Sequence, residues 1–321
     1  MKKLKVFGTP WHLAHQYELF KFDWIEWHWL IQLKRQYGTL SRGEFDVKWE
    51  TCYEPGKYDF ALLHLDQQCL EASLWERGKG SLYRELNEVI QDIPKVVIMH
   101  GTPHYPEAFE NPQQMIDLCK KAIGDNPMIT NSYRAAEMWG FGTPIWHGLD
   151  PEEWFDLPKE PRVITMISPA GLDDYYDRTF LRYTREALHD IGINHCHITV
   201  DWRSKDWEDY RRFLGSSLIY FNPTKESPMP RSRTEAMMSG CCVLTTNNHD
   251  TDKYIVDGQN GIFVKRNPQD VVKKVLWCMK NYDQAVKIGQ AGKQTAIAKF
   301  NHKRFEQNWK DFLNDKLNIK I

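Results

Sequence analysis

The chain has 321 residues, and its 42 basic residues balance 43 acidic ones, so the net charge is near zero. That balance argues against a general role in binding nucleic acid or anionic membranes, although a local basic patch stays open. The seven cysteines are scattered and form no CxxC pair, which favours free buried thiols in a reducing cytoplasm over disulfides or a zinc site. No window approaches the ~20 apolar residues of a membrane span, and residues 1–5 lead into a strand rather than a signal peptide. We therefore expect a cytoplasmic protein with no integral membrane segment.

Strands and helices alternate through the first half of the chain. The strands are predicted at 4–8, 45–49, 59–65, 95–100, 127–132 and 143–148, and the helices at 17–37, 82–90, 113–123 and 133–139. The first of these helices is predicted because Phe20, Trp24, Trp27 and Ile31 share one helical face. The charges beside this face are mixed in sign, so a buried face is a better interpretation than a membrane surface.

The proline-rich, acidic stretch at 149–161 marks an interdomain linker, and the alternation restarts after it. Strands are predicted at 162–168, 195–201, 218–221, 242–246 and 262–265, with helices at 176–191, 207–214, 268–281, 283–298 and 302–317 and one more from Ala236 to the stop at Gly240. This alternation indicates an α/β fold of two Rossmann-like, doubly wound domains. We place them at 1–155 and 156–300, and consider that a C-terminal helix at 301–321 packs back on the first.

The stretch at 218–246 carries the clearest ligand signal. A buried apolar strand ends at Asn222-Pro223, two further prolines hold the loop extended, and a helix follows. Ligands of open parallel sheets bind beyond the carboxyl ends of the strands, and helix N-termini attract phosphate. Glu226 and Glu235 flank this place. Glu235 has two interpretations: it accepts hydrogen bonds from a ribose, or it forms a capping box with Ser232.

The same stretch resembles the donor-binding half of retaining glycosyltransferases with the GT-B fold, of the large nucleotide-sugar-dependent family four. The resemblance rests on Asn222-Pro-Thr-Lys-Glu226, Thr234-Glu-Ala-Met-Met-Ser-Gly240 and the turn Asp257-Gly-Gln-Asn-Gly261. Asn131-Ser132 and Trp146-His-Gly-Leu-Asp-Pro-Glu-Glu-Trp-Phe155 are similar to two shorter segments of that family. The resemblance to GT-B glycosyltransferases implies two domains that face each other across a cleft.

In that family seven residues separate two glutamates, the first contacting the donor sugar and the second the ribose. Glu235 matches the second, but eight residues separate it from Glu226, and Ser227 holds the usual first position. Either Glu226 points inward from a longer loop or Ser227 replaces it.

The family also has Gly-Arg, and a lysine a few residues later, after the first strand of the donor domain. Both contact the diphosphate, and both are absent from the sequence Ile167-Ser-Pro-Ala-Gly-Leu-Asp-Asp here. A diphosphate still needs positive charge and hydrogen-bond donors. The candidates are Arg178, Arg203, Lys225 and Arg231, with the helix-start amides near Arg233.

Histidines supply the remaining candidates. The resemblance implies that His100, at a strand end, contacts the transferred sugar. His104 is the second candidate for this contact. His12 and His15 follow the first strand and are candidates for acceptor contact, beside the alternatives of a metal pair or an ordinary turn. Asp250-Thr-Asp252 matches a DxD metal motif, but it lies late in the chain and can cap a helix, so we expect no metal site and no cofactor.

The expected function is metal-independent transfer of a hexose from a UDP- or GDP-sugar to a hydroxyl acceptor, with retention. The resemblance implies that the donor phosphate helps to take the proton, so catalysis would rest on positioning and on stabilising the departing diphosphate. The alternatives are a sugar-nucleotide epimerase or phosphorylase of the same fold, a glycosyltransferase for modified DNA bases, and a non-catalytic nucleotide-sugar-binding protein. Nucleic acid therefore stays open as an acceptor.

Overall fold

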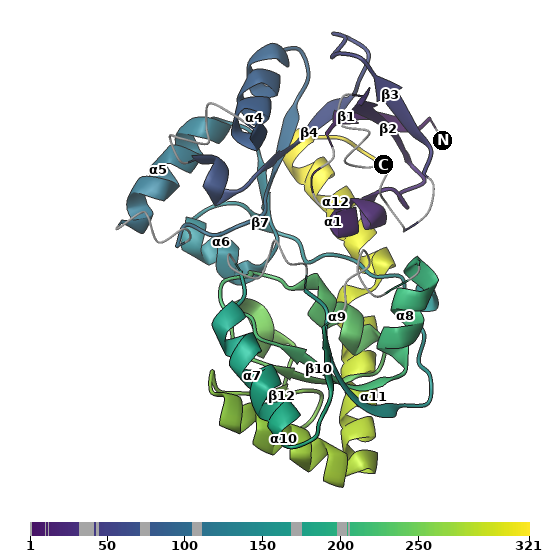
Figure 1. Ribbon diagram of the computed structural model, residues 1–321. Coiled ribbons are helices and arrows are strands. Elements are labelled where there is room, and N and C mark those ends of the chain that lie inside the picture. The colour runs from purple at the N-terminus through teal and green to yellow at the C-terminus, as the bar shows by residue number, and fades with distance from the viewer. Residues whose placement is uncertain are drawn as a thin grey trace. The chain divides into compact units, whose positions relative to one another are not determined.

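The computed structural model describes residues 2–9, 11, 13–31, 42, 45–70, 78–104, 111–167, 175–197, 204 and 206–321. The chain forms two compact units, Met1–His147 with Phe305–Ile321, and Gly148–Arg304 (Figure 1). The units part just before the stretch that we assigned to the linker. The last helix, α12 (His302–Leu317), begins in the second unit and ends in the first.

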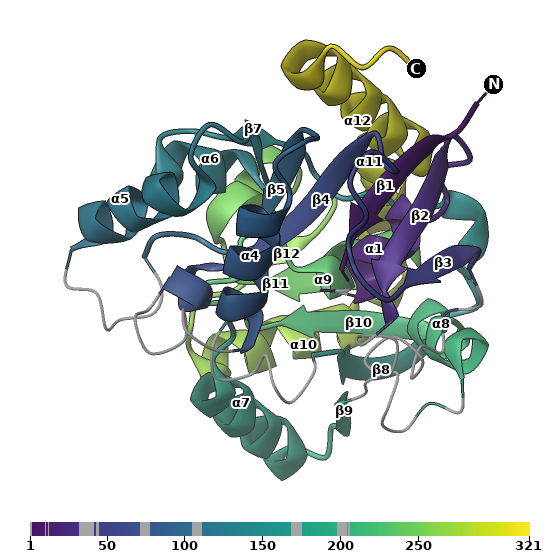
Figure 2. The same ribbon diagram turned by 90° about the horizontal axis from the view of Figure 1, so that it is seen from above.

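The first unit is built on a seven-stranded parallel sheet in the order β3-β2-β1-β4-β5-β6-β7 (Figure 2). Its strands are β1 (Leu4–Gly8), β2 (Ile25–Leu30), β3 (Val47–Glu50), β4 (Phe60–Leu65), β5 (Lys95–Met99), β6 (Met128–Thr130) and β7 (Thr143–Pro144). The strand order reverses between β1 and β4. The carboxyl ends of these two strands therefore form the switch point at which sheets of this kind bind ligands.

Helices cover both faces of this sheet. They are α1 (Leu13–Leu19), α4 (Gly78–Val89), α5 (Pro112–Ile123), α6 (Tyr133–Trp139) and α12, with a 3-10 turn, η2, at Gln67–Leu70. One core joins Tyr83 of α4, Met115 of α5 and Trp139 of α6 to the sheet. The other core contains Phe305 and Trp309 of α12, so the C-terminal helix supplies much of that face. Both faces are buried, as the continuous apolar strands require.

The helix predicted at 17–37 is wrong. α1 ends at Leu19, and Ile25–Leu30 forms β2, which pairs with both β1 and β3. Ile25, Trp27 and Trp29 alternate along this strand and enter the core that α12 covers. Dense aromatic residues satisfied the helical period and the strand period equally well, and their preference for pleated, packed surfaces favours the strand.

The second unit has a five-stranded parallel sheet in the order β12-β11-β10-β8-β9. The strands are β8 (Glu160–Thr165), β9 (His195–His197), β10 (Ser217–Asn222), β11 (Cys242–Thr245) and β12 (Ile262–Phe263). The helices are α7 (Arg178–Asp190), α8 (Trp207–Gly215), α9 (Arg231–Met238), α10 (Pro268–Lys280) and α11 (Tyr282–Phe300), with 3-10 turns η3 (Pro151–Glu153) and η5 (His249–Lys253). Here the order reverses between β8 and β10, which makes their carboxyl ends the switch point. Together with the first unit, this confirms the α/β fold with two Rossmann-like domains.

The helix after β10 starts earlier than the sequence predicted. α9 begins at Arg231, its N-cap is Pro230, and no side chain caps it. The predicted capping box of Ser232 and Glu235 is therefore wrong, because both residues lie inside the helix. The predicted stop is confirmed: Gly240 has φ 72°, and the amide of Cys241 bonds back to the carbonyl of Ala236 at 3.0 Å.

His195, at the start of β9, gives the second unit a predicted acid sensitivity. Its Nε2 lies 2.9 Å from the hydroxyl oxygen of Thr165, which itself donates to the carbonyl of Phe221. Nε2 therefore carries the proton, and burial lowers the pKa of His195 from 6.5 to about 3. Unfolding exposes a histidine that binds a proton below pH 6.5, so stability should fall as the pH drops from about 6.5 towards 3.

We expect the free energy of unfolding to lose at most about 1.4 kcal/mol per pH unit from this group. Urea unfolding between pH 7 and 4 measures it. The variant His195→Gln should flatten the dependence, whereas His189→Gln, at a histidine whose side chain is 89% exposed, should not. Equal slopes in all three proteins would contradict the assignment.

Candidate functional site

The switch point of the second unit is held together by the backbone. The carbonyl of Tyr175 accepts hydrogen bonds from the amides of Lys225, Glu226 and Ser227 at 3.0, 2.9 and 3.2 Å. An antiparallel bridge joins Tyr176 to Thr224 beside them. The segment that enters α7 is thereby fixed against the loop that follows β10. The candidates Glu226 and Ser227 therefore lie where an open sheet binds its ligand.

A buried polar network lies beneath this loop. The phenol of Tyr220 donates to the hydroxyl oxygen of Ser232 at 2.7 Å and accepts from Nδ2 of the Asn222 side chain at 3.2 Å. Burial raises the pKa of Tyr220, so the phenol stays protonated and can donate. This bond ties the end of β10 to the first turn of α9. It also explains Ser232, whose hydroxyl meets a tyrosine instead of capping the helix.

Glu235 lies at the centre of the site. One of its carboxylate oxygens, Oε1, accepts from Nε of Arg231 at 3.0 Å, and the other, Oε2, accepts from the phenol of Tyr210 at 3.0 Å. The side chains of Arg231 and Glu235 are 8% and 3% exposed. The structure therefore brings Glu235 and Arg231 together and adds Tyr210 of α8, which sequence reasoning missed.

The remaining candidates of this unit are placed differently. Glu226, Ser227 and Lys225 are half-buried, and the carbonyl of Lys225 accepts from the side-chain amide of Asn248 at 2.6 Å. Arg178 is exposed in the first turn of α7. Arg203 and the loop at 168–174, where the family has its diphosphate residues, lie outside the described residues.

Arg233 points away from the Glu235 carboxylate. It is fully buried, donates to the hydroxyl of Thr245 at 3.3 Å, and lies 5.5 Å from the ring centroid of Tyr254. Residues two apart in a helix do not share a face, which separates Arg233 from the pair at 231 and 235.

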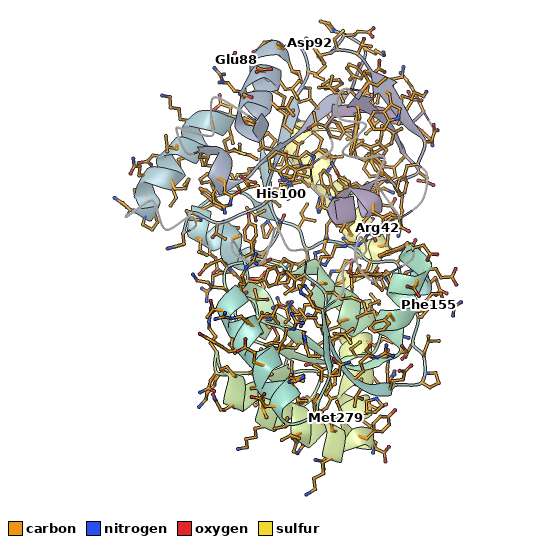
Figure 3. The ribbon with its side chains drawn as sticks, viewed as in Figure 1. Arg42, Glu88, Asp92, His100, Phe155 and Met279 are labelled. Carbon is orange, nitrogen blue, oxygen red and sulfur yellow. The ribbon has the colours of Figure 1, made fainter. Side chains whose placement is uncertain are left out.

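A second cluster occupies the switch point of the first unit. Nδ1 of His64 lies 3.0 Å from Nε2 of His100, and Trp11 stacks on both rings with interplanar angles of 18° and 11°. His15 meets His100 edge-on at 5.9 Å between ring centroids. Figure 3 labels His100 after β5. The cluster thus gathers residues from β4, from the segment between β1 and α1, from α1 itself and from the end of β5.

One of the predicted histidines, His104, does not join this cluster. His104 is exposed three residues beyond Gly101, and His12 lies outside the described residues. His64 and Trp11 were missed. His64 interrupts a strand that is otherwise apolar, Phe60–Leu65, and this lone polar residue was the available signal.

Two further features bear on metals and membranes. Asp250 and Asp252 lie in the short turn η5, and the described part of the chain contains no group of three or more metal-ligating side chains. Among the helices of the described ranges, none combines the length and the apolar character needed to cross a bilayer. All seven cysteines are free thiols, and Cys52 is exposed rather than buried as expected.

These sheets and their switch points define the class of protein, a two-unit α/β protein of the GT-B type. HepE of Anabaena, solved in complex with UDP, is similar with a TM-score of 0.68 at 12% identity over 98% of this chain and 100% of that one. Sucrose-phosphate synthase of Thermosynechococcus elongatus is similar with a TM-score of 0.66 at 9% identity, covering 98% of this chain and 100% of the other. At such identities the likeness shows the fold.

A match to a sequence family lies in the second unit. Residues 186–295 match the family model described as Glycosyl transferases group 1. An uncharacterized glycosyltransferase of Methanocaldococcus jannaschii is 23% identical over 172 residues, which are 51% of this chain and 41% of that protein. The match thus spans less than half of the relative's length. The predicted resemblance to glycosyltransferases is confirmed at the level of this group.

Proposed function

We propose that the protein transfers a sugar from a nucleoside diphosphate sugar, linked to UDP or GDP, to a hydroxyl acceptor. The observation that carries this proposal is the Glu235 carboxylate, fixed at the carboxyl end of the second sheet by Arg231 and Tyr210. A carboxylate oxygen can accept more than one hydrogen bond, which is the chemistry that recognition of the two ribose hydroxyls requires. The neighbour from Anabaena, crystallised with UDP and with UDP-glucose, supports a nucleotide-sugar donor.

The chemistry that we propose is retaining and independent of metal. The donor phosphate takes the proton of the attacking hydroxyl as the sugar bond to the diphosphate breaks, so the enzyme needs no separate strong base. The second unit positions the nucleotide and stabilises the departing diphosphate through cationic side chains and the N-terminus of α9. His100 contacts the transferred sugar, and Glu226 or Ser227 holds its hydroxyls.

A panel of UDP-, GDP- and dTDP-sugars, read by thermal unfolding, tests the donor. We expect the matching nucleotide to stabilise the protein, because a ligand at 100 times its dissociation constant adds about 2.7 kcal/mol to the free energy of unfolding. EDTA should leave this shift unchanged. If none of the nucleotides moves the unfolding temperature, the proposal is wrong.

The reaction is tested by release of the nucleoside diphosphate. We expect release to require an acceptor and the product to keep the anomeric configuration of the donor, as NMR would show. Release without acceptor, or conversion of the donor to an epimer, would identify a different reaction. A protein that is stabilised by the nucleotide but turns nothing over would be a non-catalytic binder.

A further inference from the structure

The ion pair of Arg231 and Glu235 has an unusual place for a pair of charges. Both side chains are nearly fully buried, and both lie in α9, which follows the central strand β10. Burying two charges costs several kcal/mol per ion before their attraction is counted, so such a pair is weak evidence for a stabilising role.

The geometry divides the guanidinium into two ends. The bond to Glu235 uses Nε of Arg231 at 3.0 Å, and the other four N–H donors of a guanidinium are on its two Nη nitrogens. A guanidinium presents five N–H donors in a planar fork, which matches the oxygens of a phosphate. Arg231 is also the first residue of α9, where the helix adds positive potential and backbone amides.

We propose that Arg231 and Glu235 form one preassembled clamp for a nucleoside diphosphate. Glu235 takes the ribose hydroxyls, and Arg231, held through Nε, turns its Nη edge to the diphosphate. Tyr210 fixes the second carboxylate oxygen and acts as a positioning residue. This inference rests on the proposed function and deepens it, because it assigns the diphosphate cation that the sequence after β8 does not supply in the family's positions.

The placement of the other cations favours Arg231. Arg178 is exposed in α7, and Arg233 faces Thr245 and Tyr254 rather than the carboxylate. Lys225 is half-buried and carries a point charge, whereas a planar fork meets two phosphate oxygens at once. Arg231 is joined directly to the side chain that we assign to the ribose. Its position is therefore set by the same contact that orients Glu235.

Calorimetric titration with uridine and with UDP separates the two halves of the clamp; guanosine and GDP take their place if the donor panel selects GDP-sugars. In Arg231→Gln both ligands lose the ordering of Glu235, and we expect the affinity for the diphosphate to fall about 10- to 100-fold more than the affinity for the nucleoside, since only the diphosphate also loses a charged hydrogen-bonded contact. Arg231→Lys should recover part of the loss. In Tyr210→Phe we expect nucleoside and diphosphate to weaken together, because the ribose contact is disordered.

Arg212→Gln is the matched control. It breaks another pair of arginine and glutamate four residues apart, that with Glu208 of α8, whose side chains are 52% and 56% exposed. Its affinities should equal those of the wild type. Equal losses of nucleoside and diphosphate affinity in Arg231→Gln would show that Arg231 only orders Glu235, and unchanged affinities would remove it from the site. Either result overturns the clamp, whereas a wild-type protein that binds neither diphosphate would overturn the proposed function itself.

Discussion

Replacing Glu235 with glutamine should raise the apparent donor constant at least tenfold. The variant keeps the shape of the side chain but loses the charge that accepts the ribose hydroxyls, and hydrogen bonds to a charged group contribute about 1.5–3 kcal/mol each. The same change converts one acceptor oxygen into a donor that faces Arg231 or Tyr210. Initial rates at varied donor concentration, with circular dichroism as a check of folding, measure the effect.

The choice of glutamine follows from the burial of the ion pair. Both substitutions remove the charge that faces Arg231, and breaking a buried pair costs about 3–5 kcal/mol. Alanine also removes the hydrogen-bond acceptor and leaves a cavity, whereas glutamine keeps the volume and one oxygen that can accept from Arg231. Glu235→Ala should therefore weaken donor binding and also lower the unfolding temperature, so a loss of ribose contact could not be separated from a loss of stability in that variant. A folded Glu235→Gln protein with the wild-type donor constant would disprove the ribose assignment.

Adding one methyl group at Gly289 should destabilise the second unit severely. Gly289 lies in α11, and a Cβ atom there would stand 2.3 Å from the carbonyl oxygen of Gly240 and 3.0 Å from backbone atoms of Cys241 and Cys242. These atoms belong to the turn that ends α9 and starts β11, so no side chain can rotate out of the way. We expect Gly289→Ala to cost about 3 kcal/mol or more, the upper range for overpacked sites.

Intrinsic helix propensity predicts the opposite sign for this variant. Alanine favours a helix over glycine by about 1 kcal/mol, so only the close approach of α11 to the end of α9 can make the substitution harmful. Thermal unfolding measures the difference. The control is Gln294→Ala in the same helix, at an exposed position, which should stay within about 0.5 kcal/mol of the wild type. A Gly289→Ala protein of wild-type stability or better would contradict the packing described here.

Most of the fold could be predicted because the central strands are continuous apolar runs between clear turn residues. The strands Lys95–Met99 and Ser217–Asn222 coincide closely with the apolar runs from which they were predicted. Ser132 caps α6 as predicted, because its hydroxyl oxygen accepts a 3.0 Å hydrogen bond from the backbone amide of Ala135. Local chemistry of this kind is visible without the partners. The stretch at 25–30 could not be assigned because its aromatic residues suit either period, and tertiary pairing with β1 decides.

The candidate site was predictable where a motif marks it and not where the fold assembles it. Glu235 stands out in the sequence because it lies in the motif Thr234-Glu-Ala-Met-Met-Ser-Gly240, five residues before the glycine that ends the helix. Tyr210, 25 residues earlier, reaches it only because α8 and α9 lie beside each other in the second unit. His64 and His100 likewise meet because β4 and β5 are neighbours in the sheet, at a separation of 36 residues. Contacts between residues this far apart in the sequence leave no pattern in either local segment.

A crystal structure of the full chain with UDP, or with GDP if the donor panel selects it, tests the central claim most directly. We predict that the ribose hydroxyls lie within hydrogen-bonding distance of the Glu235 carboxylate, with the diphosphate at Arg231 and the first turn of α9. The bond between Nε of Arg231 and Glu235 should persist in that complex. A nucleotide bound with its ribose away from Glu235, or away from the carboxyl ends of β8 and β10, would contradict the account.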